Sequence, residues 1–100
     1  MKIKIGINGM GRIGRMILRS IYEGNKKIEI MHINNRTNSE TCSTLLKHDS
    51  IHGKFKADIS YDENNLIVNK NKISFGQETD LNKINWKKYG VDYVFECTGK

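Results

Sequence analysis

The sequence predicts an α/β fold: a Rossmann-type parallel sheet, incomplete in this chain, with a small antiparallel meander inserted before its last strand. Two observations support this prediction. Residues 2–8 alternate polar and aliphatic side chains, as a strand does, whereas residues 12–23 carry apolar side chains at helical spacing. Residues 28–33 form a second, mostly apolar strand, so the chain opens with a strand–helix–strand unit whose strands should be parallel.

The two helices have recognisable limits in the sequence. Gly24 and Asn25 are expected to end the first helix. Ser39 is the predicted N-cap of a second helix that continues through residues 45–47, although Cys42 stands where Glu or Gln would complete a capping box. The stripe predicted to be buried on the first helix consists of Ile13, Met16, Ile17, Ser20 and Ile21.

The second half of the chain loses the helical pattern. Short antiparallel strands are predicted at residues 54–60, 66–69 and 72–75, with turns at residues 64–65 and 69–71. A short irregular or helical stretch around Trp86 should span residues 82–89, ahead of an apolar strand at residues 91–97. About three parallel strands result, where a complete sheet needs about six, so the last strand should leave an unpaired edge that favours association.

Composition bounds the class of protein. The chain has 100 residues, enough for one small domain, and its 37% hydrophobic and 28% charged residues suit a soluble globular protein. It has no apolar run of membrane-spanning length, and because its first residues lack a continuous apolar h-region we expect them not to be a signal peptide. Cys42 and Cys97 form no disulfide framework or CxxC metal site, so we expect a reducing, cytoplasmic location. The net charge of +6 comes from scattered lysines, which indicates no dedicated nucleic-acid or membrane partner.

A glycine-rich segment, GMGRIG, joins the first strand to the first helix. It fits the G-x-G-x-x-G pattern, which is specific for a dinucleotide only in this strand–loop–helix context. Gly9 allows the tight turn, Gly11 lets a pyrophosphate approach the backbone, and Gly14 lets the helix pack close to the strand. The free N–H groups of Gly11, Arg12 and Ile13 would face the anion at the positive end of the helix.

The end of the second strand bears on which dinucleotide is bound. Sites of this type usually place a carboxylate about 20 residues after the glycines, where it binds the adenosine ribose. This chain has Asn34, Asn35 and Arg36 there instead. Either Asn35 fills a turn and Arg36 is solvated, or the pair tolerates or prefers a 2′-phosphate. NAD and NADP therefore both remain candidate cofactors.

Three segments resemble the glyceraldehyde-3-phosphate dehydrogenase family. Residues 4–15, KIGINGMGRIGR, are similar to the family's opening KxGINGFGRIGR. Residues 45–55, LLKHDSIHGKF, resemble its LLKYDSTHGKF segment, and residues 96–99, ECTG, resemble its ESTG motif. Trp86 also stands where the family often has a tryptophan. The resemblance covers the whole chain in order, and it is far more specific than the glycine loop.

The resemblance implies an architecture and a reaction. Residues 1–100 would be the N-terminal part of a dinucleotide-binding domain, followed in the family by the rest of that domain and an α+β catalytic domain, in a homotetramer. A cysteine thiolate attacks D-glyceraldehyde 3-phosphate, with a histidine as base, and hydride passes to the nicotinamide. Inorganic phosphate then releases 1,3-bisphosphoglycerate, a reaction of glycolysis and gluconeogenesis. Both catalytic residues lie beyond residue 100 in the family, so we expect no turnover from this segment alone.

The resemblance also assigns cofactor-binding positions, and this sequence departs from the family at two others. Asn35 stands where most NAD-using members have Asp, and Thr79 stands where they commonly have an Arg near the adenine. Cys42, Cys97 and the three histidines are interpreted as non-catalytic. The positions expected around the cofactor are Asn8, Gly9, Gly11, Arg12, Ile13, Cys97, Thr98 and Gly99, together with Asn35 and Arg36.

Other functions are kept open at this point. Erythrose-4-phosphate dehydrogenase shares these motifs, and residues 1–100 do not contact the substrate in the family. A non-catalytic dinucleotide-binding module would lack a later Ser-Cys-Thr-Thr-Asn type of segment. A nucleic-acid-binding protein would show a steep salt dependence of binding.

Overall fold

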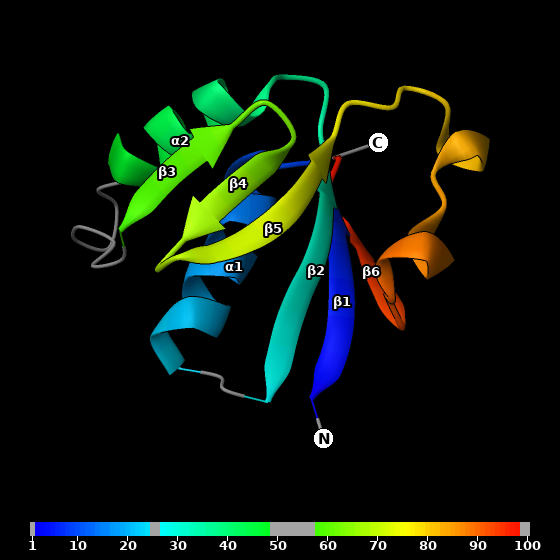
Figure 1. Ribbon diagram of the computed structural model, residues 1–100, viewed down its shortest axis with the longest axis horizontal. Helices are drawn as coiled ribbons and strands as arrows, with labels where there is room; N and C mark the ends of the chain where they lie inside the picture. Colours follow the sequence, from blue (N-terminus) through cyan, green and yellow to red (C-terminus); the bar gives the residue numbers. More distant parts are fainter. Residues whose placement is uncertain (1, 25–26, 49–57, 99–100) are drawn as a thin grey trace.

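A computed structural model describes residues 2–24, 27–48 and 58–98, and within these ranges the strands form one six-stranded sheet in the order β3-β4-β5-β2-β1-β6 (Figure 1). No helix in the described ranges is long and apolar enough to cross a membrane. The elements are β1 (Ile3–Asn8), α1 (Arg12–Gly24), β2 (Ile28–Asn34), α2 (Ser39–His48), β3 (Ile59–Asp62), β4 (Asn65–Val68), β5 (Asn71–Gly76), the 3₁₀ helices η1 (Leu81–Lys83) and η2 (Trp86–Tyr89), and β6 (Tyr93–Glu96).

The sheet is mixed, and its parallel part is larger than the sequence indicated. β1 pairs in parallel with β2 and with β6, as predicted for the strand–helix–strand unit. The meander forms antiparallel pairs between β3, β4 and β5. Its last strand, β5, also pairs in parallel with β2. The meander therefore extends the main sheet, and four parallel strands end at one edge where three were expected.

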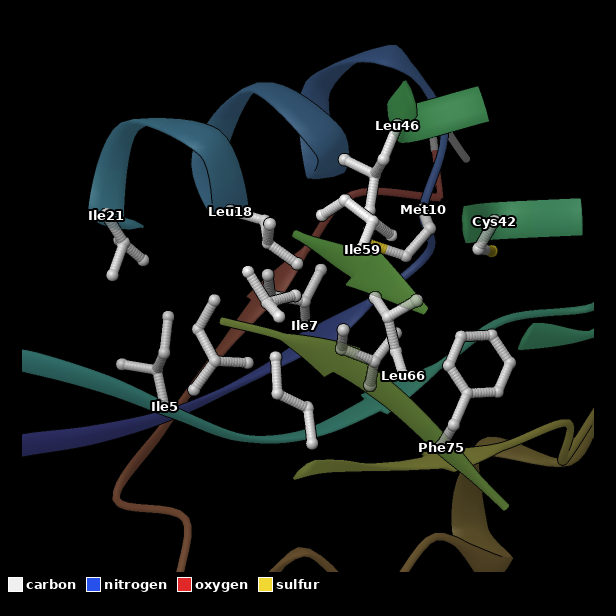
Figure 2. Close-up of a cluster of buried hydrophobic side chains, with 14 residues drawn as sticks. Ile5, Ile7, Met10, Leu18, Ile21, Cys42, Leu46, Ile59, Leu66 and Phe75 are labelled. Atoms are coloured by element: carbon white, nitrogen blue, oxygen red, sulfur yellow. The ribbon is translucent and has the colours of Figure 1, made fainter. Parts of the chain in front are cut away.

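The predicted buried stripe of α1 was only partly right. Ile21 is buried and Ile17 packs against the core, as predicted, but Ile13 and Met16 are 58% and 47% exposed. Leu18, which was not predicted, points into the core beside Ile7 (Figure 2). The cause is Gly14, on which a Cβ would strike the carbonyl oxygen of Gly9. This close approach turns the face that contains Gly14, Leu18 and Ile21 toward the sheet.

One hydrophobic core lies between the sheet and the two α-helices (Figure 2). It is continuous from α1 through the strands to α2, because Leu18 and Leu46 belong to the same buried cluster as Ile7. Aliphatic side chains dominate it, as expected for strands that are covered by helices. The cluster comprises Ile5, Ile7, Met10, Leu18, Ile21, Ile30, Ile33, Cys42, Leu46, Ile59, Leu66, Val68, Ile73 and Phe75.

The N-cap of helix α2 lies one residue earlier than predicted. The side chain of Asn38 accepts a hydrogen bond from the backbone N–H of Thr41 at 2.9 Å, so Asn38 is the N-cap. Ser39 instead donates its hydroxyl to the carbonyl of Asp62 at 2.6 Å. Both residues have cap-forming side chains, and the tertiary bond to β3 decides between them.

The meander follows the prediction with shifted boundaries. Its first strand, expected from residue 54, is seen from Ile59, and residues 49–57 lie outside the described ranges. The first turn falls on Glu63 and Asn64 rather than one residue later. The second turn holds Asn69 and Lys70 at φ values of 50° and 70°, the left-handed conformation that suits a tight hairpin.

Strand β6 is an edge strand of the sheet, as predicted, and it is largely uncovered. It pairs only with β1 among the described strands. Tyr93, Val94 and Phe95 are 63%, 39% and 36% exposed. An uncovered apolar edge strand of this kind promotes association with another strand or helix.

An aromatic cluster covers the sheet on the face opposite the α-helices. The ring of Trp86 lies over Gly6, where a Cβ would strike it. His32 stacks on Tyr89 with ring centroids 3.7 Å apart, meets Trp86 edge-on at 5.4 Å, and shares a 2.9 Å hydrogen bond through Nδ1 with Ser74 Oγ. Burial, with a smaller contribution from the charge of Lys88, lowers the pKa of His32 from 6.5 to about 4.

Because Gly14 lies so close to the carbonyl of Gly9, we expect that adding one methyl group at position 14 strongly lowers stability. Gly14→Ala should lower the free energy of unfolding by roughly 1–3 kcal/mol, because the methyl group overpacks a backbone contact. Gly24→Ala is the matched control, since a Cβ at Gly24 meets nothing within 4 Å. Urea unfolding measures both, and equal stabilities for the two variants would contradict the account.

Neutral His32 should make the fold sensitive to acid. The unfolded chain takes up a proton near pH 6.5 and the folded chain only near pH 4, so stability falls as the pH drops through that window. The loss is at most about 3.4 kcal/mol, at 1.36 kcal/mol for each pH unit between 6.5 and 4. We expect His32→Phe, which keeps the stacking, to lose less stability than wild type between pH 7 and 4.5. Identical pH slopes would show that His32 is not the group responsible.

Candidate functional site

The carboxyl ends of the four parallel strands meet at one edge of the sheet, the upper edge in Figure 1. Ligands of open α/β sheets bind at this edge. A cavity of about 470 Å³ opens there, between the glycine loop, the loop after β2, the segment after β5 and the end of β6. Its lining residues are Asn8, Gly9, Gly11, Asn34, Asn35, Arg36, Thr37, Glu78, Thr79, Glu96, Cys97 and Thr98.

Most of the residues expected around a cofactor lie in this cavity. They are Asn8, Gly9, Gly11, Asn35, Arg36, Cys97 and Thr98. Arg12 and Ile13 do not line it; they form the exposed first turn of α1, directly after Gly11. Gly99 lies outside the described residues.

The glycine loop has the shape that the sequence predicted. Gly9 has a φ of 99°, and a Cβ there would lie 2.8 Å from the carbonyl carbon of Cys97 and the N of Thr98. A Cβ on Gly11 would meet nothing within 4 Å, so the space above this residue is open on the cavity side. This open cradle at the start of α1 fits the pyrophosphate of a dinucleotide, because backbone N–H groups and the helix dipole attract an anion there.

Asn35 connects the glycine loop to the loop after β2. Its Oδ1 accepts the backbone N–H of Met10 at 2.9 Å. Its Nδ2 donates to Thr37 Oγ1 at 2.7 Å and to Cys42 Sγ at 3.3 Å. Asn35 is thus more than a turn residue, since both hydrogens of its amide and its oxygen are engaged.

A chain of side-chain hydrogen bonds crosses the ends of the parallel strands. Asn8 Nδ2 donates to both carboxylate oxygens of Glu96, at 3.1 and 2.9 Å. Asn34 Nδ2 donates to Asn8 Oδ1 at 3.0 Å and to the carbonyl of Glu78 at 2.9 Å, and Asn34 Oδ1 accepts the N–H of Glu78 at 2.9 Å. These bonds join β6 to β1, to β2 and to the segment after β5.

Sequence reasoning did not assign five of the lining residues to the cofactor site, although it noted Asn34 and Thr79; the five are Asn34, Thr37, Glu78, Thr79 and Glu96. Asn34 and Glu96 end β2 and β6, so the positions of polar residues at strand ends could have indicated them. Nothing in the sequence pattern indicated Glu78, whose position depends on β5 pairing with β2.

Neither thiol has the properties of a nucleophile. Burial raises the pKa of Cys42, whose sulfur faces Asn35 and Thr37. Burial and the charge of Glu96 raise the pKa of Cys97, which lies in the cavity wall. Within the described ranges no group of three or more His, Cys, Asp or Glu is placed to hold a metal ion.

Comparisons with known proteins identify the family of this chain. The family model described as glyceraldehyde 3-phosphate dehydrogenase, NAD binding domain, matches residues 3–100. Glyceraldehyde-3-phosphate dehydrogenase of Thermotoga maritima is 47% identical over 97 residues, which cover 96% of this chain and 29% of that protein. The Geobacillus stearothermophilus enzyme is 43% identical over 100 residues, covering 100% of this chain and 30% of that protein. The chain therefore spans under a third of these relatives, and it belongs to the family of glyceraldehyde 3-phosphate dehydrogenase NAD-binding domains.

Proposed function

We propose that this chain is the N-terminal part of the dinucleotide-binding domain of a phosphorylating glyceraldehyde-3-phosphate dehydrogenase. The observation that carries the proposal is the cavity at the carboxyl edge of the sheet, where the open backbone at Gly11 begins a helix. Family membership over residues 3–100 supports the same assignment. In this function the protein oxidises D-glyceraldehyde 3-phosphate with a nicotinamide dinucleotide and inorganic phosphate, and it forms 1,3-bisphosphoglycerate.

The residues of this chain bind and orient the cofactor in the proposed function. The N–H groups of Gly11, Arg12 and Ile13 would hold the pyrophosphate, with Asn8 and Gly9 beside it. Cys97 and Thr98 would lie along the cofactor from the other wall, and Gly99, which is outside the described residues, is assigned to the cofactor by the family resemblance. The bound nicotinamide supplies the hydride acceptor. The family resemblance assigns the nucleophilic cysteine and its histidine base to positions beyond residue 100, and the raised pKa values of Cys42 and Cys97 support this assignment.

The oligomeric state, location and substrate-binding domain that we propose follow from the same assignment. We propose a homotetramer in the cytoplasm, with the aldehyde phosphate bound by a separate catalytic domain. The uncovered edge of β6 supports a further segment or subunit packing against this domain.

The test of this function is a coupled assay on the full-length protein. Reduction of the dinucleotide should require both glyceraldehyde 3-phosphate and inorganic phosphate. Faster turnover with erythrose 4-phosphate would assign the alternative substrate. Dinucleotide binding without turnover of either aldehyde would indicate a non-catalytic module.

We further propose that the enzyme uses NADP at least as well as NAD. A carboxylate at position 35 would bind the ribose hydroxyls and repel a 2′-phosphate, whereas Asn35 carries no charge. Its amide hydrogens are directed at Thr37 and Cys42, so its contribution is the absence of repulsion. Arg36 lies beside it in the cavity wall, where a guanidinium can bind a phosphate in bidentate fashion.

This cofactor preference is measured as kcat/KM for NADP and NAD in wild type, Asn35→Asp and Arg36→Ala. Asn35→Asp should shift the ratio toward NAD by about tenfold or more, since 1.4 kcal/mol is a factor of ten. Arg36→Ala should lower kcat/KM for NADP and leave that for NAD nearly unchanged. A hundredfold native preference for NAD that neither variant alters would refute the proposal.

A further inference from the structure

We propose that Glu96 is a positioning residue for the cofactor cavity, and that it acts through Asn8 and Asn34 on the segment around Glu78. This inference rests on the proposed dinucleotide site. It assigns a role to the carboxylate of Glu96, which ends β6 and belongs neither to the glycine loop nor to the end of β2. The connection runs across β6, β1, β2 and the segment that follows β5.

The carboxylate of Glu96 determines how the side-chain amides of Asn8 and Asn34 are oriented. An ionised carboxylate only accepts hydrogen bonds, so Asn8 must turn its Nδ2 toward Glu96 and its Oδ1 toward Asn34. Asn34 must then donate to Asn8, which leaves Asn34 Oδ1 facing the N–H of Glu78. Reversing the amides would place Asn34 Nδ2 against the N–H of Glu78, two donors facing each other.

Burial makes this orientation matter. Asn8 and Asn34 are only 3% and 4% exposed, so their amides depend on partners within the protein, whereas Glu96 at the end of β6 is exposed. A buried amide that loses its hydrogen-bond partner is destabilised, because it has already given up its contacts with water. Within the described residues no buried side-chain nitrogen or oxygen lacks a hydrogen-bond partner. The two amides are therefore fully paired, and Glu96 is the acceptor at the end of the series.

The other end of the series forms a wall of the cavity. Asn34 binds both the N–H and the carbonyl of Glu78, at 2.9 Å each, which fixes this residue against β2. Gln77 Nε2 donates to the carbonyl of Arg36 at 3.0 Å, so the same segment also contacts the loop that follows β2. Glu78 and Thr79 face the cavity with Asn35 and Arg36, on the side where the adenosine half of a dinucleotide binds.

A positioning role and a simple charge effect of Glu96 predict opposite changes in ligand affinity. A carboxylate in a cavity for an anionic ligand repels that ligand, so removal of its charge alone would strengthen binding. Under the proposal, loss of the acceptor weakens binding of the adenosine half. Glu96→Ala removes the acceptor, whereas Glu96→Gln retains an amide oxygen that can still accept from Asn8.

The experiment measures dissociation constants for AMP and NAD by calorimetry on the full-length protein. Glu96→Ala should weaken AMP binding about threefold to tenfold, which corresponds to the net contribution of one hydrogen bond. Glu96→Gln should remain within about twofold of wild type. Asp92→Ala is the control for loss of an exposed acidic residue on the approach to β6, and it should leave AMP binding unchanged.

A second variant tests whether Glu96 acts through Asn34. Asn34→Ala interrupts the series, so it should weaken AMP binding by itself, and adding Glu96→Ala should then have no further effect. It also serves as the test if Glu96→Ala proves unstable. Additive effects, or tighter AMP binding in both Glu96 variants, would overturn the proposal. A wild-type protein that binds neither AMP nor NAD would refute the dinucleotide site itself.

Discussion

The contact of Gly14 with the carbonyl of Gly9 determines how the first helix leaves the sheet, and the rest of the site depends on it. Only a residue without a Cβ allows the backbone of α1 to approach the turn this closely. The contact rotates α1 so that Leu18 and Ile21 enter the core. It also places the first turn of the helix next to the open cavity at Gly11. Packing and ligand binding therefore share one geometric requirement.

The two faces of the sheet stabilise this arrangement differently. The face toward α1 and α2 carries the aliphatic core, which is continuous from Ile7 to Leu46. The opposite face carries the aromatic cluster of His32, Trp86 and Tyr89. Between them the strand ends are joined by buried amides rather than by apolar contacts. The buried side-chain polar groups at this edge are fixed in position because, within the described residues, none of them lacks a hydrogen-bond partner.

The sequence was sufficient for the features that depend on local pattern. The strand–helix–strand unit, the glycine loop and its position at a strand end all followed from periodicity and spacing. Features that depend on tertiary contacts did not. Apolar spacing favoured Ile13 and Met16 as core residues, but it holds no information about the contact at Gly14.

Competition between similar side chains explains the other differences. Asn38 and Ser39 can both cap a helix, and the hydrogen bond from Ser39 to Asp62, 23 residues away in sequence, decides between them. The series from Glu96 to Glu78 joins strands that are separated by most of the chain. Such a connection becomes visible only when the sheet order is known, because each residue by itself is an ordinary polar residue in a loop or at a strand end.

We infer that the backbone at Gly11 is open because a dinucleotide pyrophosphate occupies that space. Calorimetric titration of NAD into wild-type and Gly11→Ala protein, with urea unfolding of both, tests it most directly. A Cβ on Gly11 meets nothing within 4 Å, so stability should change by no more than about 1 kcal/mol. The dissociation constant for NAD should rise at least about tenfold, a difference of 1.4 kcal/mol. Unchanged NAD affinity in a stable Gly11→Ala protein would contradict the account.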